Sequence, residues 1–187
     1  MKRVLKREFR ANYWAKIVLC LLFGLGLAAC GLGSSDSAGT EIEFSNGTFA
    51  ETMVEAQITS LFAEIYESIE PTLVVDEGTT RTLFAPNNAA VEKYLAEAAE
   101  TIAGLKAKPE AAEALVLAHM VDGEVSATSL LNLGEKQLTM LNGANLSVAR
   151  EANSTLLITD SGRRSALIAI DIASKDGVVH IIDTVLN

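Results

Sequence analysis

The fold is decided by the stretch Asp176-Gly177-Val178-Val179-His180-Ile181-Ile182-Asp183-Thr184-Val185-Leu186. Its Asp-Gly pair is a turn signal, and the apolar residues that follow predict a strand over Val178–Ile182. Because side chains alternate along a strand, His180 lies on the face opposite to Val179 and Ile181. We interpret His180 as a structural histidine whose ring nitrogens pair with the backbone or with a carboxylate.

More strands are expected before this stretch, because apolar residues in the last third of the sequence recur with a period of two. They are Gln137–Leu141, Asn145–Ala149, Thr155–Thr159 and Ala166–Ile172. Turn residues separate the strands at Asn142-Gly143, Asn153-Ser154 and Ser161-Gly162. The last third therefore predicts a β meander.

The preceding part of the sequence favours helices. From Phe49 to Ile69 the apolar residues recur at helical spacing, and Pro71 ends this helical run. Thr79–Ala85 is rich in β-branched and aromatic residues, which predicts a short strand that Pro86 stops.

Two further helices are expected after Pro86. Asn87 or Asn88 caps the first, since an Asn side-chain oxygen accepts a backbone N–H at a helix start. Its apolar side uses Val91, Leu95 and Ile102. The second helix runs from about Pro109, which suits the first helical position, to His119. Helices followed by a β meander define an α+β fold.

The N-terminal segment differs sharply in charge from the rest of the sequence. Residues 1–30 carry six basic side chains and one acidic side chain, whereas residues 31–187 carry nine basic and 23 acidic ones, a net charge of −14. The apolar run Ile17–Ala29 would span about 20 Å as a helix, less than the ~30 Å hydrocarbon core of a bilayer. This pattern favours an export signal, with a retained signal anchor as the alternative.

The end of that run, Leu27-Ala28-Ala29-Cys30-Gly31, resembles a lipobox. Small residues let a peptidase approach the cleaved bond, and the Cys30 thiol accepts a diacylglyceryl group. We therefore expect a lipoprotein signal peptide over 1–29, lipidated Cys30 with a flexible Gly- and Ser-rich tether over 30–46, and one domain over 47–187. A plain signal peptide with an incidental Cys30 is the alternative.

Catalytic, metal and nucleic-acid functions find little support in the residue pattern. The two histidines, His119 and His180, come without the further ligand spacing of a metal site, and we expect no metal and no cofactor. The sequence has no Gly-x-Ser-x-Gly nucleophile elbow and no calcium loop. An excess of acidic residues repels nucleic-acid phosphates. The chain is therefore not expected to be an enzyme.

Three segments together resemble the fasciclin domain family. They are Thr82–Val91, the helix end at His119 with Val121-Asp122-Gly123-Glu124-Val125 after it, and Asp176–Leu186. The resemblance implies a wedge-like α+β fold, with short-stranded, β-sandwich-like sheets flanked by N-terminal helices. It also implies an extracellular or envelope module for adhesion and protein–protein contact. The motif positions that it carries over are Phe84, Pro86, Asn88, His119, His180 and Asp183.

The resemblance also points to an interaction site. The adhesion segment of the family corresponds to Ala169-Ile170-Asp171-Ile172-Ala173, which keeps Asp171 and Ile172. Position 118 is Ala where the family usually has Tyr. The expected interaction residues are therefore Asp171, Ile172 and His119.

These observations lead to a functional hypothesis. We expect a non-enzymatic adhesion or protein-interaction module, held at a bacterial cell envelope by its lipid, with a protein or extracellular-matrix ligand as its partner. Gly31 is not the Asp that can signal inner-membrane retention, so the outer membrane or the periplasmic face is preferred. The alternatives are an envelope accessory protein that supports a membrane complex, and a small-molecule binder or hydrolase with a pocket beside His119 or His180.

Overall fold

The computed structural model describes residues 47–70, 79–133, 137–151 and 154–187. They belong to one compact unit, residues 42–187. The predicted signal peptide, lipidation site and tether, Pro71 and the turn at Asn153 lie outside the described residues. Within the described ranges, no helix is both long and apolar enough to cross a membrane.

The predicted helical run from Phe49 to Ile69 divides into two helices. They are α2 (Phe49–Glu55) and α3 (Ser60–Ile69). Gln57, between them, takes a positive φ of 57°, a conformation that a continuous helix does not allow. The side chain of Asn88 holds this turn, because its amide donates to the Gln57 carbonyl (3.1 Å) and its oxygen accepts the Leu61 N–H (3.0 Å). The prediction of one uninterrupted helical run was thus wrong. The apolar residues keep helical spacing across Gln57, but the backbone conformation of Gln57 ends the first helix.

The next helical segment is also divided. Asn87 caps α4 (Asn88–Glu97) by accepting the Ala90 N–H at 2.8 Å. This helix ends before Ile102, which begins the separate helix α5 (Ile102–Lys106). Helix α6 (Pro109–Leu117) starts at Pro109 as predicted and ends two residues before His119.

Within the described residues, seven strands form a sheet in the order β2-β1-β7-β6-β5-β4-β3. Their bounds are β1 Arg81–Pro86, β2 Met120–Asp122, β3 Gln137–Thr139, β4 Asn145–Glu151, β5 Ser154–Thr159, β6 Arg164–Ser174 and β7 Gly177–Ile182. Strands β1 and β7 pair in parallel, and the other neighbours pair antiparallel. A short helix, α7 (Ala127–Leu131), connects β2 to β3 and was not predicted.

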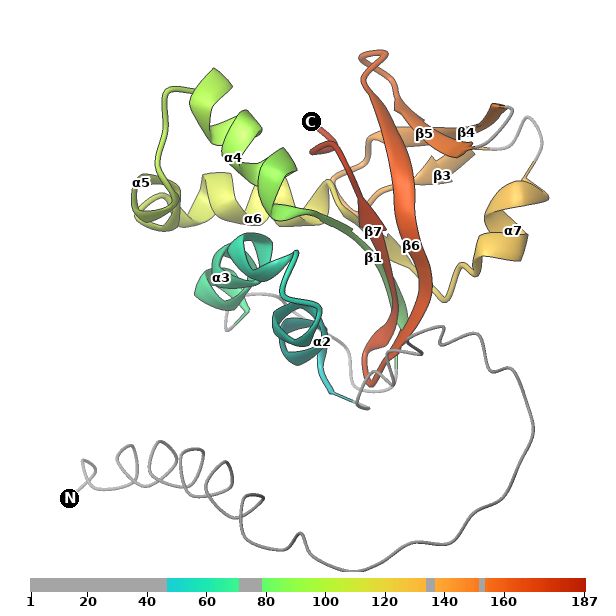
Figure 1. Ribbon diagram of the computed structural model, residues 1–187, viewed down its shortest axis with the longest axis horizontal. Coiled ribbons are helices and arrows are strands. Elements are labelled where there is room, and N and C mark those ends of the chain that lie inside the picture. Colours follow the sequence, from blue (N-terminus) through green and yellow to red (C-terminus); the bar gives the residue numbers. More distant parts are fainter. Residues whose placement is uncertain (1–46, 71–78, 134–136, 152–153) are drawn as a thin grey trace, which may run out of the picture. The chain divides into compact units, whose positions relative to one another are not determined.

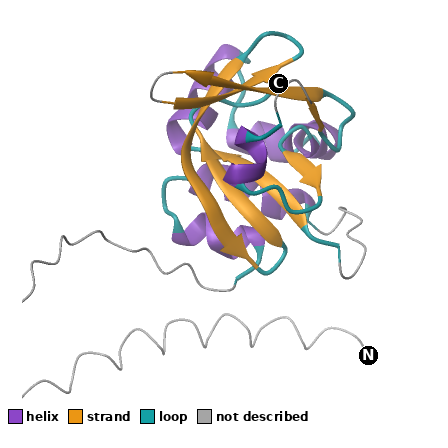
Figure 2. Ribbon diagram, turned by 90° about the vertical axis from the view of Figure 1, so that its right-hand side faces the viewer, coloured by secondary structure: helices purple, strands orange, loops and turns teal. Residues whose placement is uncertain are grey.

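The long strand β6 joins the two halves of this sheet. Its first residues, Arg164–Ala166, pair with β5, and Leu167–Ser174 pair with β7. In Figure 2, the strands at the top of the domain run across the view, whereas those below run down it. The expected pair of sheets therefore consists of two differently directed halves that share β6, and the α+β fold class is confirmed.

The sheet separates two hydrophobic cores. Helices α2 to α6 cover one face of β1 and β7, while α7 and β3 to β5 lie on the other side (Figure 1). We call the core between the helices and the sheet the helical core. Its largest fully buried side chains are Phe49, Met53, Phe62, Ile65, Ile69, Leu83 and Met120. We call the core on the side of α7 and β3 to β5 the strand core. Its buried residues are Phe84, Val121, Leu130, Leu138, Met140, Leu146, Leu157, Ile182 and Leu186.

Gly177 lets the central strands approach closely. Its φ is 137°, and a Cβ at this position would lie 1.9 Å from the Arg81 carbonyl oxygen. Since no side chain fits there, glycine is required where β7 starts beside β1. The Asp176-Gly177 turn signal thus also marks a close backbone approach between β7 and β1.

Candidate functional site

His119 lies one residue beyond the C-cap of α6 and is completely buried. Its Nδ1–H donates to the Leu115 carbonyl (2.7 Å), and its Nε2 accepts the Leu186 N–H (2.9 Å). The ring also packs against Phe62, with ring centroids 5.1 Å apart. Burial lowers the pKa of His119 to about 4, although its bond to the Leu115 carbonyl opposes this shift. The imidazole is therefore a neutral connector between α6 and the segment after β7, and its ring is out of reach of a partner.

His180, within β7, is also completely buried. Its Nε2–H donates to the Val125 carbonyl (2.8 Å), and its Nδ1 accepts the Asp171 N–H (3.2 Å). The ring stacks on Phe84 at a centroid distance of 5.4 Å. Burial lowers the pKa of His180, while the bond to Val125 and the charge of Asp171 oppose the shift. Through these hydrogen bonds His180 connects β7 to β6 and to the segment that precedes α7.

Asp171 and Ile172 lie at an irregularity in β6. The pairing passes from Ala169↔Ile181 to Ile172↔Val179, so two residues of β6 oppose His180 alone. Asp171 takes a positive φ of 55° there, and its exposed carboxylate accepts the Ala127 N–H (2.7 Å) at the start of α7. Ile172 is 4% exposed and belongs to the helical core. Of the three expected interaction residues, Asp171 is the one that reaches the surface.

The other motif positions make contacts within the domain. Asp183 accepts the Ala166 N–H (2.8 Å) and the hydroxyls of Ser165 and Thr184. Pro86 ends β1 opposite Ile182. Together with Phe84 under His180 and Asn88 at the α2–α3 turn, these residues connect segments that are far apart in the sequence. Their arrangement is that of a structural framework.

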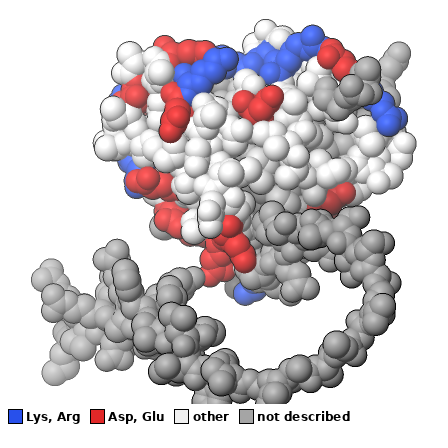
Figure 3. All heavy atoms as spheres, viewed as in Figure 1, with Lys and Arg blue, Asp and Glu red and all other residues white. Residues whose placement is uncertain are grey.

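Two isoleucines beside Asp171 are the surface feature that the sequence reasoning missed. Ile168 and Ile170 are 49% and 51% exposed, whereas Ala169 between them packs against the helical core. We call Ile168, Ile170 and Asp171 the β6 surface. Charged groups gather near the edges of the face in Figure 3, and its middle, where β6 runs in Figure 1, is largely uncharged. Strand alternation could have indicated the isoleucines, but not the irregularity that exposes Asp171.

One group of titratable side chains lies near the start of α2. Burial, with the charges of Glu70 and Asp176, raises the pKa of Tyr66 to about 12, and burial also raises the pKa of Glu70. Asp176 accepts the Phe49 N–H (2.8 Å) and so holds the first turn of α2. Within the part of the chain that the structure describes, no group of three His, Cys, Asp or Glu residues could hold a metal ion.

This geometry defines an α+β domain whose histidines and motif carboxylate serve its architecture, with an apolar strand surface facing outward. The chain belongs to the fasciclin domain family, whose profile matches residues 48–187. The fold is similar to the solved structure of a FAS1 domain pair from the insect cell adhesion molecule fasciclin I, with 19% identity and a TM-score of 0.51. That match covers 71% of this chain and 46% of the other, so the present chain spans about half of the domain pair. No curated protein matches the sequence. Fasciclin domains are generally non-catalytic modules of adhesion proteins.

Proposed function

We propose that this protein is a non-enzymatic interaction module, held at a bacterial cell envelope by a lipid on Cys30, that binds a protein partner through the β6 surface. The observation that carries the proposal is the exposure of Ile168 and Ile170 beside Asp171. Two half-exposed isoleucines on a paired strand offer apolar area that a partner can bury without ordering a loop.

The internal bonding of the two histidines supports a non-catalytic function. A general base must reach the proton that it abstracts. His119 and His180 instead direct both ring nitrogens at backbone groups inside the domain. Burial lowers the pKa of both rings, which favours the neutral form that packs inside the domain.

The lipid anchor is supported by the order of features in residues 1–31: a basic start, a short apolar run, small residues and then Cys30. Each buried methylene of an acyl chain contributes about 0.8 kcal/mol of membrane affinity, so several chains anchor a domain firmly. Metabolic labelling with palmitate tests this part. We expect label in the wild-type protein and none in Cys30→Ala; equal label in both would discard the anchor.

Crosslinking and affinity capture from intact cells, followed by mass spectrometry, tests the binding function. The variant Ile168→Ser with Ile170→Ser removes the apolar part of the β6 surface. Because serine at either position buries less apolar area against a partner than isoleucine does, we expect recovery of the partner to fall by about tenfold or more. The matched control is Val54→Ser with Ile58→Ser, which removes two side chains that are also about half exposed, at 50% and 46%.

The comparison between the two double variants decides the result. Retained capture in the control with loss in the β6 variant supports the proposal. Equal recovery from both variants would remove the β6 surface from it. If intact cells yield no specific partner of the wild-type protein, the interaction function itself fails.

A further inference from the structure

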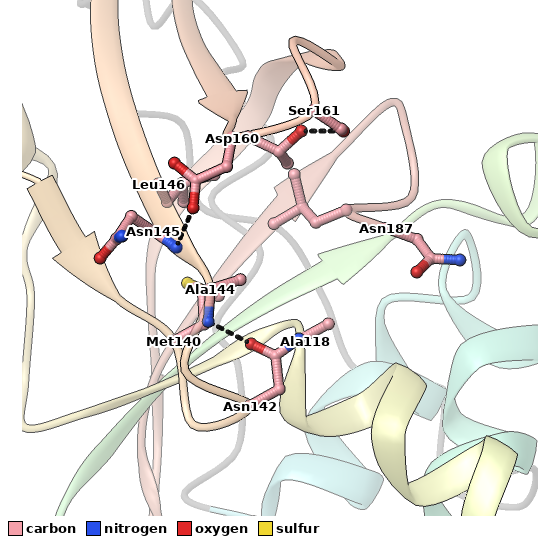
Figure 4. A pocket seen from close by; sticks show the side chains of 11 residues that line it. Ala118, Met140, Asn142, Ala144, Asn145, Leu146, Asp160, Ser161 and Asn187 are labelled. Carbon is pink, nitrogen blue, oxygen red and sulfur yellow. Dashed lines mark hydrogen bonds between the residues drawn. The ribbon is translucent and has the colours of Figure 1, made fainter.

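A pocket of about 260 Å³ lies where the end of α6 meets the turns that flank β4 and β5. It is distinct from the β6 surface and from both histidine rings. Ala118, Met140, Leu146 and Leu186 supply its apolar lining, and the turn residues Asn142 and Asp160 lie toward its rim (Figure 4). It thus combines residues from four separate parts of the sequence.

The apolar lining is fixed in position. Met140, Leu146 and Leu186 are at most 4% exposed and belong to the strand core. The backbone N–H of Leu186 donates a hydrogen bond to the ring of His119, the residue next to Ala118. Since Ala118 carries only a methyl group, the space above it stays open. A ring placed there would extend the strand core without requiring a rearrangement.

The polar side of the pocket is built by two turns. Asn142 accepts the Ala144 N–H (3.0 Å), and one carboxylate oxygen of Asp160 accepts the Asn145 N–H (2.9 Å), as the dashed lines in Figure 4 show. Asp160 is exposed and carries the only charged side chain among the residues that line the pocket. An apolar lining beside one carboxylate suits an occupant with an apolar body and a positive charge close to it.

We propose that this pocket is an anchor site for one aromatic side chain of a partner protein, with a basic group of that partner placed beside Asp160. This inference rests on the proposed interaction function. Pockets for small-molecule ligands usually measure about 300–1,000 Å³, so a volume of about 260 Å³ suits a side chain better than a cofactor. Buried aromatic anchors carry much of the binding energy at protein interfaces. The excess of acidic residues in 31–187 also favours a basic partner.

The test is a titration of the full-length, ¹⁵N-labelled protein in zwitterionic micelles with three acetylated dipeptide amides. One is tryptophan followed by lysine, the second tryptophan followed by glutamate, and the third alanine followed by lysine. Amide chemical shifts of Ala144, Asn145 and Ser161 report occupation of the pocket. We expect saturable shifts with the first peptide, binding about fivefold weaker with the second, and no saturation with the third.

Three variants locate the binding. Ala118→Phe fills the pocket from the end of α6 and should abolish the shifts. Ala144→Phe fills the pocket from the turn and should abolish the shifts as well. It keeps the test valid if the domain does not fold with a larger side chain at the buried position 118. Asp160→Asn keeps an acceptor for the Asn145 N–H but removes the charge, so the affinity for the lysine peptide should fall about fivefold.

The matched control is Ala114→Phe, one turn earlier on α6 and exposed. It adds the same ring outside the pocket and should leave the titration unchanged. Absence of saturable shifts in the wild type would overturn the anchor site. Equal binding of the lysine and glutamate peptides, or binding that persists in both filling variants, would overturn it as well. Such a failure with cellular capture intact rejects the pocket alone, whereas absence of any captured partner rejects the proposed function.

Discussion

His119, just after α6, and His180, within β7, are both fully buried, yet they hold different parts of the domain. His119 lies beside Phe62 and joins α6 to the segment after β7. His180 joins the β6 irregularity to the connection before α7, close to the exposed carboxylate of Asp171. The comparison shows that a buried histidine can stabilise the core at one position and hold a surface segment in place at another.

The largest effect is expected for His119→Ala. The change removes a ring packed against Phe62 and leaves the Leu186 N–H without its acceptor in the core. We expect the free energy of unfolding to fall by about 4 kcal/mol, measured by urea denaturation. The contrast between the two histidines is broken if His180→Ala proves more costly.

The pH dependence separates the two histidines next. The folded-state pKa of His119 is about 4, below its ordinary value of 6.5, so between these values only the unfolded state takes up a proton. Stability contributed by the neutral ring is complete above pH 6.5, is lost as the pH falls, and is reduced by about 3 kcal/mol at pH 4.

Urea denaturation of the wild type and of His119→Gln, which keeps a polar side chain without this titration, isolates the contribution. The difference in stability between the two should shrink as the pH falls from 7 to 4. A constant difference across that range would show that His119 does not carry this proton linkage.

His180→Ala is expected to cost less, about 2–3 kcal/mol, because part of its function is to hold a surface segment. The Asp171 N–H and the Val125 carbonyl lose their partner. Hydrogen exchange should therefore quicken in β6 around Asp171 and at the start of α7 before it quickens in α6. Uniform acceleration across both regions would mean that His180 stabilises the whole domain.

The smallest effect sharpens the comparison at the surface. Asp171→Ala loses the acceptor for the Ala127 N–H and places a Cβ at positive φ without a compensating side-chain bond, so we expect a loss of about 1 kcal/mol in thermal or urea denaturation. Asp171→Asn keeps both an acceptor and a residue that tolerates this conformation, and should remain within about 0.5 kcal/mol of the wild type. Equal losses in the two variants would place the effect in the charge instead.

The fold could be predicted from the sequence wherever pattern and backbone agree. The period of two predicted the strands from Gln137 onward, and the turn signal at Asp176-Gly177 marked the start of β7. The division at Gln57 could not be predicted in the same way, since apolar residues continue at helical spacing on both sides of it. Its cause is a bond from Asn88, thirty-one residues later.

The candidate site was harder to predict, because it depends on an irregularity. Simple alternation cannot show that Asp171 adopts a positive φ while Ile172 turns into the helical core. The pocket likewise joins Ala118 to turns more than twenty residues away, which no local pattern brings together. What the sequence did indicate was the class of fold, and with it the family.

The position of β7 has a consequence for how the chain is made. This interior strand is the last of the described strands to emerge from the ribosome, and the segment that donates a hydrogen bond to His119 follows it. Until β7 has been synthesised, β1 and β6 lack their shared neighbour. The core is complete only when Leu186 has followed. A nascent chain that still lacks β7 is therefore incompletely folded, however many of the preceding helices have already formed.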